Sequence, residues 1–538
     1  MLFNSYAFIF AFLPITLIGY ALLGLGAGRR DLSVWWLVVC SAVFYAIWNP
    51  INLAIIGPSL IINFALARVL QGRVARGAAD DRVSSAILVL GVVLNLCFLG
   101  YFKYRNFFVD SLNHVLGLHW PLIEVLLPLG ISFITFQKIA FLIDVRNGTV
   151  KHFEMVDFLI FVAFFPQLIA GPIVHYREMV PQFGTSSNRI TLSNLCIGVI
   201  LFAIGLFKKA VLADGIAPHA TAFFTMGDRG DPLGFAYAWL GALAFMLQVY
   251  FDFSGYSDMA IGLARVFGIR LPINFNSPLK ATSIIDFWNR WHMTLTRFLT
   301  AYVYGPLTLH LTRSRISRGR PIVAKSGSRP DAFIVLVALP TVFTMFLSGL
   351  WHGAGLTFVL YGLLHGAYLV VNHAWRQWRP QWDRQRYQRV MGPLGLVLTL
   401  TSAVFAMALF KSRTIDGARH VMHAMLGLDG VRLPTAVLGR LGTAGQWLET
   451  AGVFGDAYSG ANFIAAVLWS FVLLMLAVVA PNSLQVMARF EPALGMKSVV
   501  AGRWQVRLDF RWALLFGLML LVGLMSLNQV SEFLYWQF

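Results

Sequence analysis

Charged residues are scarce in this sequence. Only 12% of its 538 residues are Asp, Glu, Lys or Arg, whereas 58% are hydrophobic. Apolar runs of about 20 residues, the length that a helix needs to cross the hydrocarbon core of a bilayer, recur along almost the whole chain. This composition excludes an ordinary soluble domain and predicts an all-α polytopic membrane protein, organised as a single integral-membrane domain over residues 1–538. Its length is sufficient for about ten to fourteen crossings or part-crossings.

Acidic residues are the rarer of the two charged classes. There are 24 Asp and Glu against 42 Lys and Arg, which gives a formal net charge of +18. In a soluble chain this excess would suggest a nucleic-acid partner, but here basic residues gather in short loops between apolar runs, notably 313–329 and 376–389. Such loops are typical of the cytoplasmic side, where they contact anionic lipid headgroups. We therefore expect membrane lipid, and no nucleic acid, as a partner.

Cysteine and several catalytic motifs are also lacking. The three cysteines, Cys40, Cys97 and Cys196, lie within apolar runs without His or Cys at metal-ligand spacing, so neither a disulfide framework nor a metal site is expected. The sequence contains no GxSxG nucleophile elbow, no phosphate-binding loop and no HExxH helix. These absences remove the motif-based case for serine hydrolases, P-loop enzymes and zinc peptidases.

Polar groups interrupt the apolar sequence most conspicuously in two stretches, 285–295 and 348–355. An ionisable residue at bilayer depth costs at least about 2.5 kcal/mol, so it usually faces a cavity, a partner or a substrate path. The apolar runs 332–351 and 354–375 lie between two basic loops and are predicted to form a hairpin. His352 lies at its turn, away from the cytoplasmic loops and inside the bundle.

His292 lies in a second unusual segment, Ser283 to Tyr304. Aromatic and charged residues mix too evenly there for a lipid-facing span, so we expect a helix at the interface or buried in the bundle. Ser283 followed by Asp286 resembles a capping box and predicts the start of that helix. The sequence favours structural and functional roles for His292 equally.

For the other polar residues at membrane depth, the sequence allows two structural interpretations each. Gln137, Lys138 and Asp144 lie in a segment interrupted by proline and glycine. This pattern predicts either a cavity wall or, equally, that Lys138 and Asp144 pair with each other or extend to the membrane interface. Asp252 and Asp258 would point to different faces of one helix, so they are expected to position helices or line a cavity. Ion pairs with arginines 265 or 290 are the alternative for these aspartates, and glycine 255 between them is expected to break the helix.

A buried neutral imidazole is a suitable general base at physiological pH. The small residues after His352 leave room for a substrate, and a second histidine and an asparagine could orient His352 or bind the carbonyl being attacked. From the residues alone, we infer a buried histidine site that is open to a substrate tunnel.

Six motif-like stretches follow one another along the chain: GISFITFQ (130–137), FFPQLIAGP (164–172), FDFSGYSDMAIGL (251–263), NFNSP (274–278), SIIDFWNRWHMTLTRFL (283–299) and GLWHGAG (349–355). In this order they resemble the membrane-bound O-acyltransferase family, in the bacterial branch of the alginate O-acetylation membrane protein and the D-alanyl transfer protein of teichoic acid modification. The C-terminal sequence Phe533–Phe538 also resembles the alginate member.

This resemblance implies a helical bundle with broken or re-entrant helices around a central tunnel, with its motif-bearing core at about 125–375. His352, in the WHG motif, takes the place of the family's catalytic histidine, and His292, in the RWH motif, that of its second active-site histidine. The resemblance implies that His352 acts as the base and that His292 positions or polarises. Further candidates for lining the tunnel or for positioning are Trp351, Asn289, Trp291, Asp258, Asn276 and Gln137.

The implied reaction carries an acetyl group from a cytoplasmic thioester, acetyl-CoA, through the bacterial inner membrane for O-acetylation of an exopolysaccharide. No bound cofactor is expected. A periplasmic acyltransferase and other exopolysaccharide-acetylation proteins are the implied partners. The sequence departs from alginate-type relatives at 305–315 and 409–413, so alginate, cellulose and other exopolysaccharides all remain open as acceptors.

Two other functions compete with this interpretation. A transporter or polysaccharide-export component could use Asp144, Asp252, Asp258 and His352 as an ion relay. It would be expected to show paired broken helices in two related halves, and the sequence shows no such repeat. A structural scaffold in a synthase complex would tolerate replacement of His352 by a residue of similar size.

Overall fold

The computed structural model describes residues 1–24, 30–184, 190–322, 329–380, 382–496, 499, 504–507 and 509–528. The C-terminal stretch Phe533–Phe538, which contributed to the family resemblance, lies outside the described residues, as does part of the basic segment 313–329. The chain divides into two compact units, each formed from segments that are far apart in the sequence. The prediction of a single domain stays a prediction.

Helices long and apolar enough to cross a membrane dominate the described residues. Eight meet this criterion, and three shorter apolar helices accompany them. The prediction of an all-α multi-pass membrane protein is therefore confirmed. The eight long spans are Ile51–Ala75, Arg82–Leu116, Leu192–Arg229, Phe235–Val266, Pro330–His352, Leu356–Trp378, Gln385–Lys411 and Gly460–Val479; the shorter helices are Phe8–Leu23, Asp31–Ala46 and Phe510–Met525.

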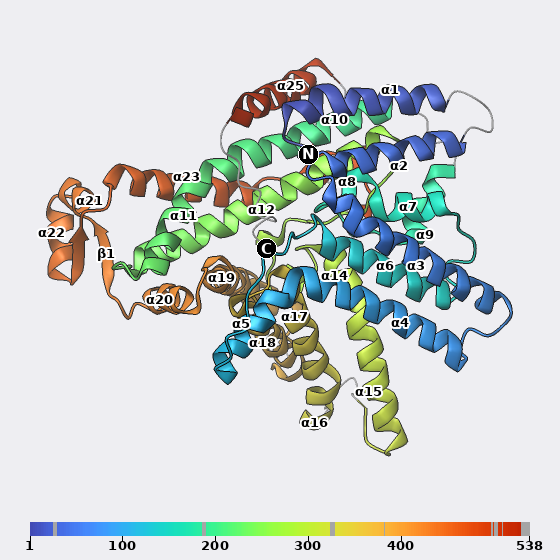
Figure 1. Ribbon diagram of the computed structural model, residues 1–538. Coiled ribbons are helices and arrows are strands. Elements are labelled where there is room, and N and C mark those ends of the chain that lie inside the picture. The colour runs from blue at the N-terminus through green and yellow to red at the C-terminus, as the bar shows by residue number, and fades with distance from the viewer. Residues whose placement is uncertain are drawn as a thin grey trace. The chain divides into compact units, whose positions relative to one another are not determined.

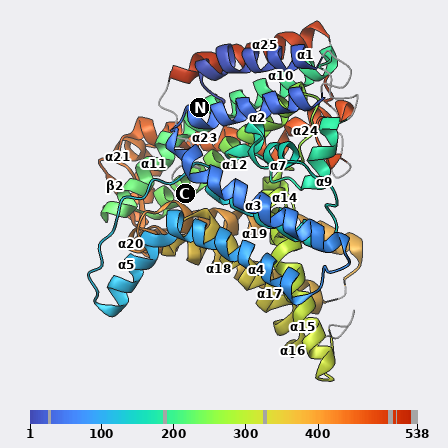
Figure 2. The same ribbon diagram turned by 45° about the vertical axis from the view of Figure 1, so that its right-hand side comes forward.

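The first unit contains Met1–Phe207, Gly255–Ile273 and Ser483–Val530. Helices α3, α4 and α6 pack side by side in it, and so do α10 and α25 (Figures 1 and 2). Its α-helices are α1 (Leu13–Leu23), α2 (Arg30–Ala46), α3 (Ile51–Ala75), α4 (Arg82–Leu99), α5 (Arg105–Leu116), α6 (Ile131–Arg146), α7 (Met155–Ala163), α8 (Phe165–Leu168), α9 (Tyr176–Met179), α10 (Leu192–Phe207), α24 (Ser483–Val486) and α25 (Phe510–Met525).

Helix α12 (Phe235–Val266) is continuous, so the prediction that Gly255 breaks it was wrong. The physical reason is close packing against α10. A Cβ atom added to Gly205 would lie 2.5 Å from the carbonyl oxygen of Gly255, and one added to Gly198 would lie 2.6 Å from that of Gly262. Small residues allow two helix backbones to approach this closely in a membrane. Gly205 of α10 thus allows the backbone of α12 to pack closely at Gly255, where α12 continues without a break.

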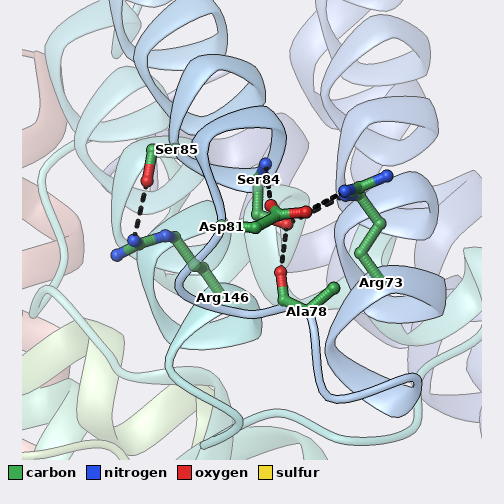
Figure 3. Close-up of polar contacts among 6 residues, drawn as sticks. All are labelled: Arg73, Ala78, Asp81, Ser84, Ser85 and Arg146. Atoms are coloured by element: carbon green, nitrogen blue, oxygen red, sulfur yellow. Dashed lines mark hydrogen bonds and ion pairs between the residues drawn. The ribbon is translucent and has the colours of Figure 1, made fainter.

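The connection between α3 and α4 is held by a compact set of polar contacts (Figure 3). Asp81 caps α4 by accepting a hydrogen bond from the Ser84 backbone N–H at 2.6 Å, and it pairs with the Arg73 guanidinium. These contacts, led by that of Ser84, hold the pKa of Asp81 below its usual value. Arg146 of α6 donates to the Ser85 hydroxyl at 3.0 Å. Arg73 of α3 and Arg146 of α6 thus help to fix how α3, α4 and α6 meet.

The second unit contains Lys208–Ser254 and Asn274–Asn482. Within it α17 packs on α18, α18 on α19, and α11 on both α20 and α23. Its α-helices, apart from its share of α12, are α11 (Asp214–Arg229), α13 (Ile284–Trp288), α14 (Met293–Leu299), α15 (Gly305–Ser317), α16 (Pro330–Phe333), α17 (Leu339–His352), α18 (Leu356–Trp378), α19 (Arg384–Lys411), α20 (Ile415–Met425), α21 (Thr435–Arg440), α22 (Thr443–Thr450) and α23 (Gly460–Val479).

Strands β1 (Val431–Pro434) and β2 (Val453–Asp456) form a small parallel sheet in the second unit, with Val431 opposite Val453. They lie in the less hydrophobic segment 412–459. The described helices are interrupted in several places by short π-helical and 3₁₀ segments. The π-helical segments are η1 (Phe8–Phe12), η2 (Gly100–Tyr104), η5 (Lys208–Ala213), η7 (Thr300–Tyr304) and η8 (Ile334–Ala338); the 3₁₀ segments are η3 (Val180–Gly184), η6 (Pro278–Lys280), η9 (Ala488–Phe490) and η11 (Ser526–Asn528). The broken helices are confirmed, and the central tunnel stays a prediction.

Candidate functional site

The segment that carries His292 is two short helices, not the one predicted. Ser283 caps α13 as expected, its hydroxyl accepting a hydrogen bond from the Asp286 backbone N–H at 3.1 Å. His292, with φ 42° and ψ 52°, then occupies the left-handed region and begins α14. Non-glycine residues with bulky side chains rarely adopt this conformation, and such outliers cluster at functional sites.

Backbone pairing with the preceding loop holds this break in place. The Met293 N–H donates to the Asn274 carbonyl at 2.9 Å, and the Asn276 N–H donates to the Arg290 carbonyl at 3.0 Å. The 274–276 loop therefore replaces the intrahelical bonds that a continuous helix would have made through 290–293. A periodicity argument does not detect such pairing between separate segments.

The hydrogen bonds around Asn274 assign the tautomer of His292. The Asn274 Oδ1 atom accepts hydrogen bonds from the backbone N–H of Thr294 at 3.3 Å and from its hydroxyl at 2.9 Å. The same oxygen lies 3.0 Å from His292 Nδ1, so Nδ1 must carry a proton and donate it. Consequently Nε2 of the neutral ring has the free lone pair.

The His292 ring is fully buried, and its Nε2 atom has no hydrogen-bond partner among the described residues. Burial lowers the pKa of His292 well below its usual range, and the nearby His352 lowers it further, so the ring is neutral at physiological pH. Orphaned buried polar atoms are uncommon in folded proteins. The arrangement presents a preoriented hydrogen-bond acceptor.

His352 is the last residue of α17 and is 5% exposed. The Trp351 ring centroid lies 4.9 Å from that of His352 and 5.5 Å from that of His292. The structure therefore brings the two predicted catalytic residues together around one indole, and we call His292, Trp351 and His352 the histidine cluster. The rings of Phe410 and Tyr361 cover the other sides of His352 at 5.1 and 6.0 Å.

Glycines fix the hairpin that presents His352. A Cβ atom on Gly349 of α17 would lie 2.3 Å from the carbonyl oxygen of Phe358, and one on Gly362 of α18 would lie 2.3 Å from that of Met345. Only glycine allows this approach, which sets the register of α17 against α18. The predicted hairpin is thus confirmed, with its turn immediately after His352.

The other predicted site residues of the second unit each lie in a different environment. Trp291 is buried in an aromatic group, stacked on Phe287 at 5.5 Å. Asn289 is the exposed C-cap of α13. Asn276 accepts a hydrogen bond from the Asn482 side chain at 3.2 Å, which ties the loop to the end of α23. Trp291 and Asn276 therefore support the segment that carries His292.

Gln137 and Asp258 belong to the first unit. Gln137 is buried in α6, and Asp258 accepts a hydrogen bond from the Ser483 hydroxyl at 2.8 Å. Arg290 pairs with Asp286, at 2.8 Å, rather than with either predicted aspartate. Asp252 instead pairs with Lys209 at 2.7 Å.

Sequence reasoning missed Asn274, although Asn276 of the same NFNSP stretch was selected. The NFNSP motif was the sequence signal that could have led to Asn274. Choosing its first asparagine over its second requires knowing that this loop pairs with the backbone around His292. His365 was missed as well: it is buried, and Trp288 Nε1 donates to its Nδ1 at 3.3 Å. Among the described residues, no group of three or more His, Cys, Asp and Glu could hold a metal ion.

Comparison with known proteins agrees with the geometry. The model of the membrane-bound O-acyltransferase family matches residues 148–318. A peptidoglycan O-acetyltransferase of Helicobacter pylori is 38% identical over 459 residues, covering 80% of this chain and 81% of the relative. A probable alginate O-acetylase, AlgI, of Pseudomonas aeruginosa is 37% identical, covering 79% and 75%. A teichoic acid D-alanyltransferase of Streptococcus thermophilus is 28% identical, covering 53% and 68%.

The first two relatives each match about four fifths of this chain and at least three quarters of their own. The matched sequence includes the 274–299 region that builds the environment of His292. Together with the apolar spans, this likeness establishes both the family and the class of reaction. The chain belongs to the membrane-bound O-acyltransferase family and is a multi-pass membrane O-acyltransferase.

Proposed function

We propose that this enzyme moves acetyl groups from cytoplasmic acetyl-CoA across the bacterial inner membrane for O-acetylation of an extracytoplasmic polysaccharide. The histidine cluster carries this proposal, because two buried imidazoles share one indole and one of them has an assigned free lone pair. Relatives named for the O-acetylation of peptidoglycan and alginate support an acetyl group and a polysaccharide acceptor. Alginate, cellulose, peptidoglycan and other polysaccharides are the candidate acceptors.

In the proposed reaction His352 is the general base. It takes the proton of the acceptor hydroxyl while the hydroxyl oxygen attacks the thioester carbonyl carbon. The new C–O bond forms, the C–S bond breaks, and the proton passes to the departing thiolate to give free CoA. His292 positions the acceptor by accepting at Nε2 a hydrogen bond from a second O–H group of the polysaccharide, because the single proton of the reacting hydroxyl goes to His352. Acetyl-CoA is a substrate here, and no resident cofactor is proposed.

A periplasmic acyltransferase is the proposed partner that completes transfer to the polymer, together with other exopolysaccharide-acetylation proteins. Purification of the tagged enzyme from detergent extracts should co-isolate an extracytoplasmic acyltransferase. Recovery of the folded enzyme without one, at detergent concentrations that preserve other membrane complexes, would contradict the partnership while leaving the acyltransferase reaction untouched.

Sealed vesicles of opposite orientation test the direction of transfer. Acetyl-CoA labelled in the acetyl group should label vesicle-associated acceptor when added to inside-out vesicles, whose cytoplasmic face is outside. Right-side-out vesicles should show only background, because CoA does not cross the bilayer. Equal labelling in both preparations, with intact vesicles, would contradict a cytoplasmic donor. Vesicles without the enzyme provide the baseline.

Replacing Asn274 tests the assigned tautomer. Asn274→Leu removes the acceptor for His292 Nδ1, and loss of a buried hydrogen bond costs about 1–3 kcal/mol, so acetylation should fall roughly tenfold to a hundredfold. Asn274→Asp keeps the acceptor oxygen and should retain more activity. Thr294→Val is the matched control, since it removes another donor to the same oxygen without touching the imidazole. If all three variants lose the same activity at equal protein level, the positioning role is wrong.

A further inference from the structure

A groove in the second unit lies between one face of α18 and one face of α19. The groove has a volume of about 860 Å³, and residues 282–284 form its third wall. The residues from α18 recur at intervals of three and four, as a single helix face requires. They are Tyr368, Val371, Asn372, Trp375 and Arg376, followed by Arg379 just beyond the helix end.

The groove mouth is cationic and aromatic. Arg376 and Arg379 have no hydrogen-bond or salt-bridge partner for their guanidinium groups among the described residues, and the residues that line the groove include no acid. The Arg379 guanidinium lies 3.7 Å from the centroid of the Tyr387 ring. Trp375 Nε1 donates to the Tyr387 hydroxyl at 3.2 Å. Stacking on tyrosine holds one arginine in place while the edges of its guanidinium stay available for an anion.

The groove becomes apolar farther along α19. Its wall there includes Leu394 and Leu398, which are 45% and 54% exposed, and Val371 of α18 is 68% exposed opposite them. From Tyr387 to Ser402 the helix rises about 22 Å, which exceeds the roughly 15 Å thickness of one hydrocarbon leaflet. Cations and tryptophan lie at one end, and aliphatic side chains lie farther along, with the small hydroxyl residues Thr399 and Ser402 at the far end of the α19 wall. This gradient matches the polarity of a phospholipid.

We propose that this groove binds one anionic phospholipid. The phosphate lies between Arg376 and Arg379, and an acyl chain follows Val371, Leu394 and Leu398. Charge complementarity selects the occupant, because the mouth carries two cations without acidic partners, whereas the apolar length excludes a free phosphate as the best fit. This site is independent of the proposed acetyl transfer.

The wall of the groove is also connected to α13. Asn372 Oδ1 accepts a hydrogen bond from the Ile285 backbone N–H at 3.2 Å, and a Cβ atom on Gly395 would lie 2.2 Å from the carbonyl oxygen of Thr282. A lipid seated between α18 and α19 would therefore brace the loop from which α13 begins. We expect bound lipid to raise the thermal stability of the enzyme.

Lipid binding to the purified full-length enzyme tests the charged mouth. In native mass spectrometry, phosphatidylglycerol should be retained in preference to phosphatidylcholine. The double variant Arg376→Ala/Arg379→Ala should bind phosphatidylglycerol about 30-fold more weakly, since each cation near an anionic headgroup contributes about 1 kcal/mol. The double variant Arg318→Ala/Arg389→Ala removes the same charge outside the groove and should bind normally. Equal losses in the two double variants, or equal retention of both lipids, would overturn the proposal.

A substitution that fills the groove tests its apolar length separately. A Cβ atom on Gly392 would meet nothing within 4 Å, so Gly392→Phe can enter the groove without a backbone clash. It should abolish the thermal stabilisation by phosphatidylglycerol. Gly517→Phe on α25 has equally open space and is the control. Inorganic phosphate and CoA should not reproduce the stabilisation; if either does so fully, or if Gly392→Phe leaves it intact, the lipid assignment is wrong.

Discussion

Replacing His352 by alanine should remove acetyl groups from the secreted polysaccharide while the yield of polymer stays unchanged. A positioned general base contributes about 10²–10⁴-fold to rate, so acetyl content per unit of polymer should fall to near background. His352 is 5% exposed beneath Phe410 and Tyr361, and alanine would also leave a cavity. His352→Gln, which keeps most of the volume without a comparable base, is therefore the more informative variant.

The control for His352 is His373→Gln on α18. His373 is half-buried and is not among the rings that contact the histidine cluster in the described part of the chain, so acetylation should persist. Each variant must be present in membranes at the level of the parent enzyme. Loss of polymer at unchanged acetylation would favour the export alternative. Full acetylation by His352→Gln would favour a scaffold role and contradict general-base catalysis.

The sequence predicted the features that follow from local pattern. Apolar length predicted the spans, the two basic loops predicted the hairpin, and the SxxD start predicted the α13 cap. The predicted hairpin places His352 away from the basic loops, as the structure does. Each of these predictions depends on residues that are close together in the sequence.

Features that depend on packing between residues far apart in the sequence were either missed or predicted wrongly. The role of Asn274 arises because its loop pairs with the backbone around His292 and Met293. Gly255 does not break α12 because its carbonyl oxygen faces Gly205 across a helix contact. Local propensity records the cost of a glycine in a helix, about 1 kcal/mol, but not the packing gain that offsets it.

The partner of Asp252 was another such long-range feature. Lys209 lies in the π-helical segment η5, and its ammonium is 2.7 Å from both Asp252 and Asp214. The side chains of Lys209 and Asp252 are only 2% and 1% exposed, and that of Asp214 is 10% exposed. One buried cation therefore serves two carboxylates and joins η5, α11 and α12.

Lys209→Met should be strongly destabilising, because it keeps most of the side-chain volume but leaves the two carboxylates without their shared cation. Removing one member of a buried ion pair costs about 3–5 kcal/mol. The variant should lose its monodisperse peak in size-exclusion chromatography at temperatures that the parent withstands, whereas Lys208→Met, the neighbouring control, should not. Lys209→Met/Asp252→Leu should recover part of the loss, because the most buried carboxylate is then absent. If Lys209→Met alone is as stable as Lys208→Met, the triad does not hold these helices together.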